Sequence, residues 1–421
     1  MCAEVHALKE LSISFCSLRV LSFRVLGGGE SLEKARVYSR IVLSLFVLAA
    51  FVIPSIVIAT PGEAGPLPPS PAWTFVVYVD GDNNLEQYWD ANSLPWLMAV
   101  PSSSDVNIVA LLDRRSTTGT QVLKISGSTV TVVETLGEMD FGDPATVTWG
   151  INRATALYPS TYFALTMWNH GWGWEFICQD VTSGNEIDMM ELQGAIAASN
   201  KNLDILAFDA CCMGNAEAIY QLAQTNLVSY IVGSEESVPG DGFPYDKMLT
   251  RLVNNPAMTP REFSAAMVDG WADYYNKIKS ASIYTLSAID VVAMKASTGT
   301  FALWSAKMLE LLPSYKSYYE TARKQANKMW GADFVDLYDY GYHLLGQSGV
   351  TDAGLRTATQ NMMSSIGPYV VHMWNGSKMT DCGGITFWFG VRSYWTTYSA
   401  DYVQLNFPID TGWGNFLTAY N

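Results

Sequence analysis

Short apolar runs that end in polar segments recur along the chain after residue 72. The runs Trp73–Val79 and Val106–Leu112 end in Asp80 and Asp113. Mainly apolar runs of this length predict strands buried on both faces of a sheet. Between and after such runs, the spacing of apolar residues predicts helices over 85–100, 146–157, 188–198 and 215–224. Strands that alternate with helices in this way indicate a mainly parallel sheet with helices on both faces.

Three more apolar runs and one hairpin extend this predicted sheet. The runs cover 162–168, 203–208 and 230–233, and the hairpin covers 121–125 and 129–133. In open sheets of this kind, the ligand crevice lies beyond the carboxyl ends of the strands. The polar side chains placed at those ends are Asp80, Asp113, His170, Cys211 and Glu235.

The second half of the chain is richer in helical patterns. Helices are predicted over 262–278, 291–312 and 315–329, and strand-like runs over 284–289 and 385–389. We interpret residues 73–255 as the core domain and 256–421 as a sheet extension with a helical C-terminal subdomain.

The segment before residue 73 has the pattern of a targeting region. Residues 1–40 form a pre-region of unclear role, and residues 41–59 are almost entirely apolar after the basic residues Lys34, Arg36 and Arg40. This order predicts a signal peptide or a membrane anchor. Residues 60–72 are rich in proline and predict an extended linker. The expected location is therefore extracytoplasmic, either secreted or membrane-anchored.

Composition excludes several classes of protein. The chain has 421 residues, of which 49% are apolar and 15% charged, so it can bury a large core and is not disordered. A net charge of -15 argues against nucleic-acid partners and suits basic substrates. The cysteines form no C-x-x-C pair, so no zinc site is expected. The sequence does not decide whether Cys178 and Cys382 form a disulfide.

His170 and Cys211 carry the chemistry that the pattern favours. Each follows a predicted buried strand and precedes a glycine-containing loop. An imidazole near a thiol can act as base and acid for nucleophilic catalysis, and N–H groups of the following helix would lower the pKa of the thiol. Either residue alone would more often be a buried structural side chain. Finding both at strand ends favours catalysis.

The segments around these two residues resemble a known family. Asn169–Trp174 and Asp209–Gly214 are similar to the catalytic motifs of the clostripain family of cysteine peptidases, in the caspase-like clan. Looser similarities occur at 82–86, 233–242, 335–337, 384–389 and 411–413. The resemblance implies a caspase-like fold from about Trp73 to the C-terminus. It also implies that His170 is the catalytic histidine and Cys211 the nucleophile, with Cys212 as the alternative nucleophile.

The resemblance further implies how substrate is bound. An oxyanion hole would use the N–H groups of Gly171 and Cys211. Family members cleave after arginine or lysine, and Asp209 matches the position of an acidic residue in the pocket for that side chain. Asp241 is a candidate second acid, for which Glu235 and Glu236 compete. A buried carboxylate pairs well with a guanidinium or ammonium group.

Two further expectations concern activation. Many relatives mature by self-cleavage between the histidine and the cysteine. Lys201 is the only basic residue in this interval, so self-cleavage of this kind is expected after it, and the alternative is that Lys201 is an ordinary surface lysine. The segment Asp80–Asn84 begins like a calcium loop, but Leu85 and Ala91 break the EF-hand pattern, which favours a helix-capping turn. No cofactor is required for the proposed chemistry. By resemblance calcium remains possible, with ligands that the sequence does not identify.

Two other functions fit the same fold. A catalytically silent caspase-like module could bind proteins without cleaving them, although the presence of both His170 and Cys211 argues against this. A thiol amidase or transferase could use the same two residues on small amides. Protein or peptide substrates with basic residues remain the favoured partners.

Overall fold

A computed structural model describes residues 71–117, 119–330 and 333–421, which belong to one compact unit. The predicted pre-region, the apolar segment 41–59 and most of the linker lie outside the described residues. Within the described ranges, no helix is both long and apolar enough to cross a membrane.

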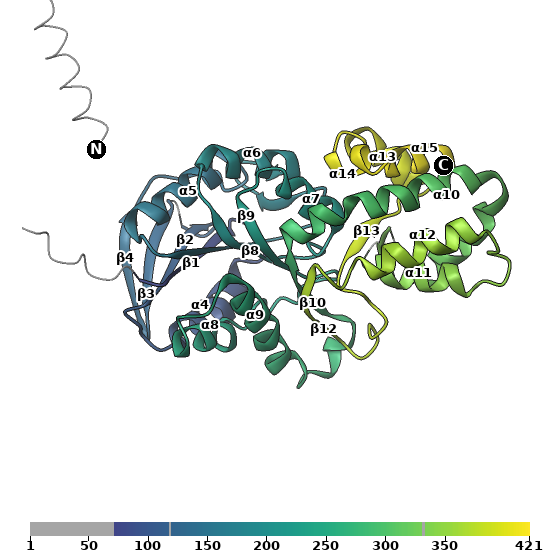
Figure 1. Cartoon of the computed structure of the whole chain (residues 1–421). Helices are drawn as coiled ribbons and strands as arrows, with labels where there is room; N and C mark the ends of the chain where they lie inside the picture. The colour runs from purple at the N-terminus through teal and green to yellow at the C-terminus, as the bar shows by residue number, and fades with distance from the viewer. Residues whose placement is uncertain (1–70, 118, 331–332) are drawn as a thin grey trace, which may run out of the picture. The chain divides into compact units, whose positions relative to one another are not determined.

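The central feature is a mixed sheet that has nine strands among the described residues (Figure 1). Its middle strands β2, β1, β5, β8 and β9 are parallel, and the strands at both edges are antiparallel. In spatial order the strands are β12 (Val370–Asn375), β10 (Thr285–Asp290), β9 (Val228–Gly233), β8 (Leu203–Asp209), β5 (Tyr162–Trp168), β1 (Trp73–Gly81), β2 (Val106–Arg114), β3 (Gln121–Ser126) and β4 (Thr129–Thr135).

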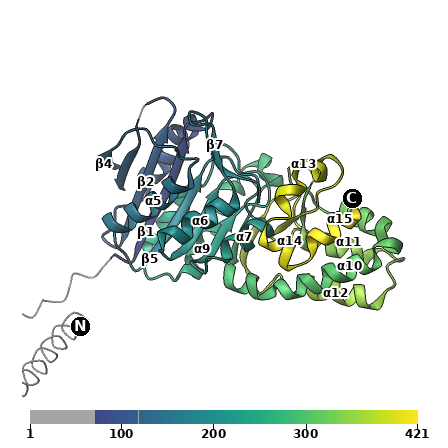
Figure 2. The same cartoon turned by 90° about the horizontal axis from the view of Figure 1, so that it is seen from above.

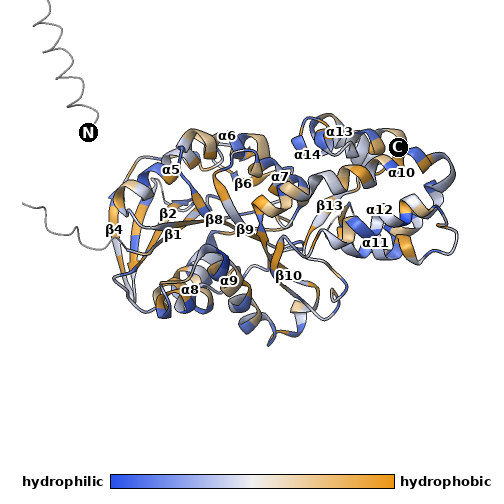
Figure 3. Cartoon of the chain, in the orientation of Figure 1, coloured by the Kyte–Doolittle hydropathy of each residue, from blue (hydrophilic) through white to orange (hydrophobic). Residues whose placement is uncertain are grey.

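Helices cover both faces of this sheet (Figures 1 and 2). One face carries α5 (Pro144–Leu157), α6 (Met189–Ser199) and α7 (Ala216–Ala223), and the other carries α4 (Leu94–Ala99), α8 (Tyr245–Asn254) and α9 (Pro260–Tyr275). Alternate residues of β1 face the two cores, with Val76 and Tyr78 on one side and Phe75 and Val77 on the other. Figure 3 shows the resulting pattern, with hydrophobic residues concentrated in the strands. The expected mainly parallel sheet with helices on both faces is confirmed.

The C-terminal region contributes strands β10 and β12 to the sheet and otherwise forms a helical layer against α7. Its elements are α10 (Val291–Gln325), β11 (Phe334–Asp336), α11 (Leu337–Gly346), α12 (Ala353–Ser364), β13 (Thr386–Trp388), α13 (Ser393–Tyr402), α14 (Asn406–Asp410) and α15 (Trp413–Tyr420). A small hairpin of β6 (Ile177–Asp180) and β7 (Asn185–Ile187) and a 3-10 helix at Lys279–Ile283 complete the fold.

Three expectations about secondary structure are wrong. The helices predicted over 291–312 and 315–329 are a single helix, α10, which continues through Pro313 because buried side chains on both sides of the proline, including Trp304 and Tyr319, hold it in the core. The strand β13 pairs with β11 and does not join the main sheet. The helix predicted over 85–100 is divided into α3 (Glu86–Tyr88), a π-helical turn at Trp89–Ser93 and α4. This last division lies beside the candidate site.

Candidate active site

The register between β5 and β8 brings His170 and Cys211 to the same edge of the sheet. Trp168 at the end of β5 is paired with Asp209 at the end of β8. His170 and Cys211 follow these partners with one intervening residue each, so the two segments that carry them leave the sheet side by side. Both residues line one cavity of about 310 Å³. Its other lining residues include Asn84, Tyr88, Trp168, Asp209, Val238 and Gly240.

His170 is half-buried and contacts the segment after β1. Its Nε2 lies 2.9 Å from Oδ1 of Asn84. Burial lowers the pKa of the imidazole below its usual value, so the ring is mostly neutral at neutral pH. With the Asn84 oxygen as acceptor, Nε2 carries the hydrogen and Nδ1 is the basic nitrogen. No role was predicted for Asn84 from the sequence, because a single amide side chain in a polar turn does not by itself indicate a function.

Cys211 is partly exposed, and its thiol donates a weak hydrogen bond to the carbonyl oxygen of Val238 at 3.8 Å. Burial raises the pKa of this thiol, and the nearby carboxylates of Glu236 and Asp209 raise it further. The expectation that helix N–H groups lower this pKa is therefore wrong. The helix α7 begins only after the Asn215 cap, so its N-terminus is not adjacent to the sulfur. A neutral thiol at rest needs a base to become a nucleophile.

Cys212 has a different environment from Cys211. Its side chain is fully buried in the core between the sheet and α6 and α7, and it does not line the cavity. Its backbone has a positive φ of 61°, and its N–H donates to the carbonyl oxygen of Glu236 at 3.1 Å. This turn directs the two neighbouring thiols in different directions, and only Cys211 is accessible from the cavity.

Gly171 lies against the loop that carries Cys211. A Cβ atom at residue 171 would lie 3.0 Å from the carbonyl oxygen of Cys211 and 3.0 Å from Cβ of Ala210. Only glycine permits this close approach without a shift of the loops. Neither the Gly171 N–H nor the Cys211 N–H donates to an acceptor among the described residues. Both N–H groups are thus free to donate to a substrate oxygen.

Asp209 lines the cavity and is buried, with 5% of its surface exposed. Its two oxygens accept the N–H of Phe243 at 3.0 Å, and Oδ2 also accepts the hydroxyl of Tyr245 at 2.8 Å. Burial raises the pKa of this carboxyl to about 7, although both hydrogen bonds lower it. No basic side chain is among the groups that perturb it. A cation entering the cavity would therefore find a carboxylate without a counterion.

Asp241 does not line this cavity. Its carboxylate accepts the amide of Asn92 at 2.9 Å and the hydroxyl of Tyr274 at 3.0 Å, so it holds the loop after β9 against neighbouring helices. Glu236 does not line the cavity either, and its Oε1 accepts the N–H and hydroxyl of Ser237 at 2.8 Å each. Of the acidic residues proposed from sequence for this pocket, Asp209 lines it.

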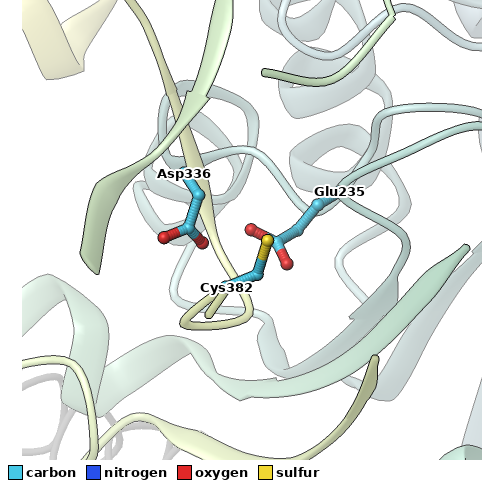
Figure 4. A group of neighbouring side chains, drawn as sticks. All are labelled: Glu235, Asp336 and Cys382. Carbon is cyan, nitrogen blue, oxygen red and sulfur yellow. The ribbon is translucent and has the colours of Figure 1, made fainter. Parts of the chain in front are cut away.

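Glu235 faces a separate buried group, shown in Figure 4 with Asp336 and Cys382. The three side chains are buried, and one ligating atom of each lies within 4.8 Å of the others. Burial and the Asp336 carboxylate raise the pKa of Glu235, so Glu235 holds a proton in this pair. Cys382 is here a free thiol, and Cys178 is a free thiol in β6. The disulfide left open by the sequence is not formed.

Lys201 lies in the connection between α6 and β8. Helix α6 ends at Ser199, its C-cap residue Asn200 adopts a left-handed conformation, and Lys201 and Asn202 are exposed. The connection is therefore accessible, as expected.

A larger cavity of about 910 Å³ lies elsewhere, among residues of α11 and the segment before β13, and contains neither His170 nor Cys211.

Comparison with known proteins identifies the family. The sequence profile of the clostripain family matches residues 77–420. Clostripain of Hathewaya histolytica is 27% identical over 220 residues, which is 42% of this chain and 42% of that protein. The match thus spans less than half of this curated relative.

Solved structures of other proteins share the fold. An inactive zymogen C11 protease from Parabacteroides distasonis superposes with a TM-score of 0.65 at 18% identity, covering 82% of this chain and 99% of that one. A secreted C11 cysteine protease from Bacteroides thetaiotaomicron, in complex with an irreversible peptide inhibitor, has a TM-score of 0.64 at 18% identity, covering 81% and 99%. Because the family profile matches most of the chain, the protein belongs to the clostripain family of cysteine peptidases.

Proposed function

We propose that the protein is an extracytoplasmic endopeptidase that cleaves after arginine or lysine with Cys211 and His170. The observation that supports this proposal is the register of β5 and β8, through which His170 and Cys211 line the same cavity as Asp209. The family to which the chain belongs supports peptide-bond hydrolysis. The net charge of -15 favours the approach of basic substrates.

The cleavage proceeds through an acyl-enzyme. Nδ1 of His170 takes the proton of the Cys211 thiol while the sulfur attacks the carbonyl carbon of the scissile bond. The carbonyl oxygen becomes an oxyanion that accepts hydrogen bonds from the free N–H groups of Gly171 and Cys211. His170 then gives its proton to the leaving amine, and the C–N bond breaks. Water, deprotonated by His170, hydrolyses the thioester and restores the thiol. These steps require no cofactor.

Specificity for a basic residue follows from Asp209. This residue lines the cavity, and its carboxylate is held by Phe243 and Tyr245 in a fixed orientation. A guanidinium or ammonium group entering the cavity supplies the counterion that the carboxylate lacks. Asp241 contributes indirectly, by holding the loop that carries the cavity wall residues Val238 and Gly240.

Self-cleavage after Lys201 would activate the protein. Support comes from the exposure of Lys201 and from the relative solved as an inactive zymogen. Export through residues 41–59, either as a cleaved signal or as an anchor, is part of the same proposal. N-terminal sequencing of the mature protein tests both points.

The experiment that tests the function is covalent labelling. An arginyl or lysyl chloromethyl ketone should alkylate the parent protein and the Cys212→Ala variant but not the Cys211→Ala variant. Failure of the parent to react, together with no cleavage of basic peptides, would favour a silent binding module. Activity on small amides without cleavage of peptides would favour an amidase.

A further inference from the structure

Trp330 lines the cavity that holds His170 and Cys211, although it belongs to the C-terminal region. It lies between α10 and β11, and the other residues that line this cavity in the described part of the chain come no later than Gly242. In Trp330, 57% of the surface is exposed. A large aromatic side chain that remains in solvent beside a reactive pair indicates a contact for a ligand.

The ring of Trp330 is held against the loop that follows His170. Its centroid lies 5.8 Å from that of Trp172, and Trp172 lies 6.2 Å from Phe334, both in edge-to-face geometry. This geometry is favoured for aromatic pairs. The loop itself is closed by a hydrogen bond from the Trp172 N–H to the carbonyl oxygen of Phe176 at 2.9 Å. Trp330 and Trp172 therefore form a fixed aromatic wall.

This aromatic wall and Asp209 lie on opposite sides of the reactive pair. Phe243 and Tyr245, which hold Asp209, belong to the core on the α8 and α9 side of the sheet. Trp172, which contacts Trp330, packs against the core on the side of α5, α6 and α7. The cavity therefore has Asp209 toward one face of the sheet and the aromatic wall toward the other, with the ends of β5 and β8 between them.

We propose that Trp330 and Trp172 form the subsite for the residue that follows the scissile bond, and that this subsite favours an aromatic or large aliphatic side chain. The subsite presupposes the proposed cleavage after arginine or lysine. With the basic side chain against Asp209, the scissile carbonyl lies at Cys211, and the leaving amine must be within reach of His170, which protonates it. Trp172 follows His170 with one residue between them. The residue that carries the leaving amine therefore comes next to the two indoles.

The chemistry of the aromatic wall suits an apolar side chain. Indole rings offer a wide apolar surface, and aromatic or aliphatic groups that pack on it are removed from water. The carboxyl of Glu175 interacts with the Trp172 side chain, and burial raises the pKa of this carboxyl to about 8. The carboxyl is therefore mainly neutral at neutral pH, so it adds no negative charge to the wall. Asp209 thus selects a basic residue before the bond, and Trp330 an apolar residue after it.

Partitioning of the acyl-enzyme tests this subsite. An N-acetyl arginine methyl ester forms the acyl-enzyme without any residue after the scissile bond, and an added amino acid amide can then replace water as the attacking group. The amine attacks the thioester carbonyl, the C–S bond breaks, and a proton of the amine passes through His170 to the sulfur. In the parent, phenylalaninamide or leucinamide should capture the arginyl group about tenfold better than glycinamide at equal concentrations, as measured by mass spectrometry of the products. In Trp330→Ala this ratio should fall to within about twofold, because the apolar contact is lost.

Two variants control for indirect effects. Trp330→Phe keeps an aromatic ring and should retain the preference for apolar amides. Tyr342→Ala removes an aromatic side chain from a residue that is 62% exposed and lies outside this cavity, so it should partition like the parent. Equal capture of the three amides by the parent, or an unchanged ratio in Trp330→Ala, would overturn the subsite alone. Absence of any acyl-enzyme from the arginyl ester would overturn the proposed function, and the subsite with it.

Discussion

Replacing Asp209 with asparagine should remove the preference for basic substrates while leaving the catalytic pair in place. Asparagine has nearly the same shape. With its oxygen in the place of Oδ2, it still accepts the N–H of Phe243 and the hydroxyl of Tyr245. The second contact of the Phe243 N–H, with Oδ1, is lost because an amide NH2 does not accept hydrogen bonds. The variant therefore removes the charge from the cavity with little change in packing.

The size of the effect follows from the buried charge. The pKa of Asp209 rises from 3.8 to about 7, which corresponds to roughly 4 kcal/mol against the ionised form at 1.36 kcal/mol per pKa unit. A bound guanidinium recovers part of this penalty. Hydrogen bonds to charged groups contribute about 1.5–3 kcal/mol, so we expect kcat/KM for an arginyl substrate to fall about 10- to 150-fold.

The assay compares an arginyl peptide with its citrulline counterpart, which has the same shape without the charge. For the parent, kcat/KM on the arginyl peptide should rise as the pH increases through about 7, because the free enzyme binds the cation only when Asp209 is ionised. The variant should lack this rise and should discriminate little between the two peptides. Equal losses on both peptides, or an unchanged arginyl preference, would refute the assignment of Asp209.

Three other predictions concern the neighbouring residues. Cys212→Ala should keep activity and lose about 1 kcal/mol of stability, as expected for a small buried side chain, whereas loss of activity in a folded protein would make Cys212 the nucleophile. Lys201→Ala should stay in one piece under conditions that split the parent, as judged by gel electrophoresis and mass spectrometry; a cut in the same loop would contradict self-cleavage at this lysine. Because the folded-state pKa of Glu235 is raised above 4.5, the parent should lose stability as the pH rises above that value. Glu235→Gln does not titrate, so its thermal midpoint should depend less on pH, and an equal dependence would show that Glu235 is not responsible.

The core of the sheet can be predicted from sequence because its strands are short, apolar on both faces and bounded by polar turns. The apolar pattern predicts Tyr162–Trp168 with the bounds that the structure has, and Leu203–Asp209 to within one residue. The C-terminal region is less predictable. A proline ends most helices, but at Pro313 packing on both sides of the ring outweighs the lost hydrogen bond. Similarly, Thr386–Trp388 is apolar enough for the main sheet, and only its partner β11 shows where it belongs.

Local patterns in the chain are enough to show that a thiol and an imidazole follow two neighbouring buried strands, because apolar periodicity and glycine-containing turns are local properties. The groups that surround the two side chains are set by tertiary packing alone. Packing left Asp209 in the lining of the cavity and Asp241 outside it, and it buried Cys212 while exposing Cys211. It also placed Asn84 against His170. These outcomes depend on register, on loop paths and on desolvation, which arise only when distant segments pack together.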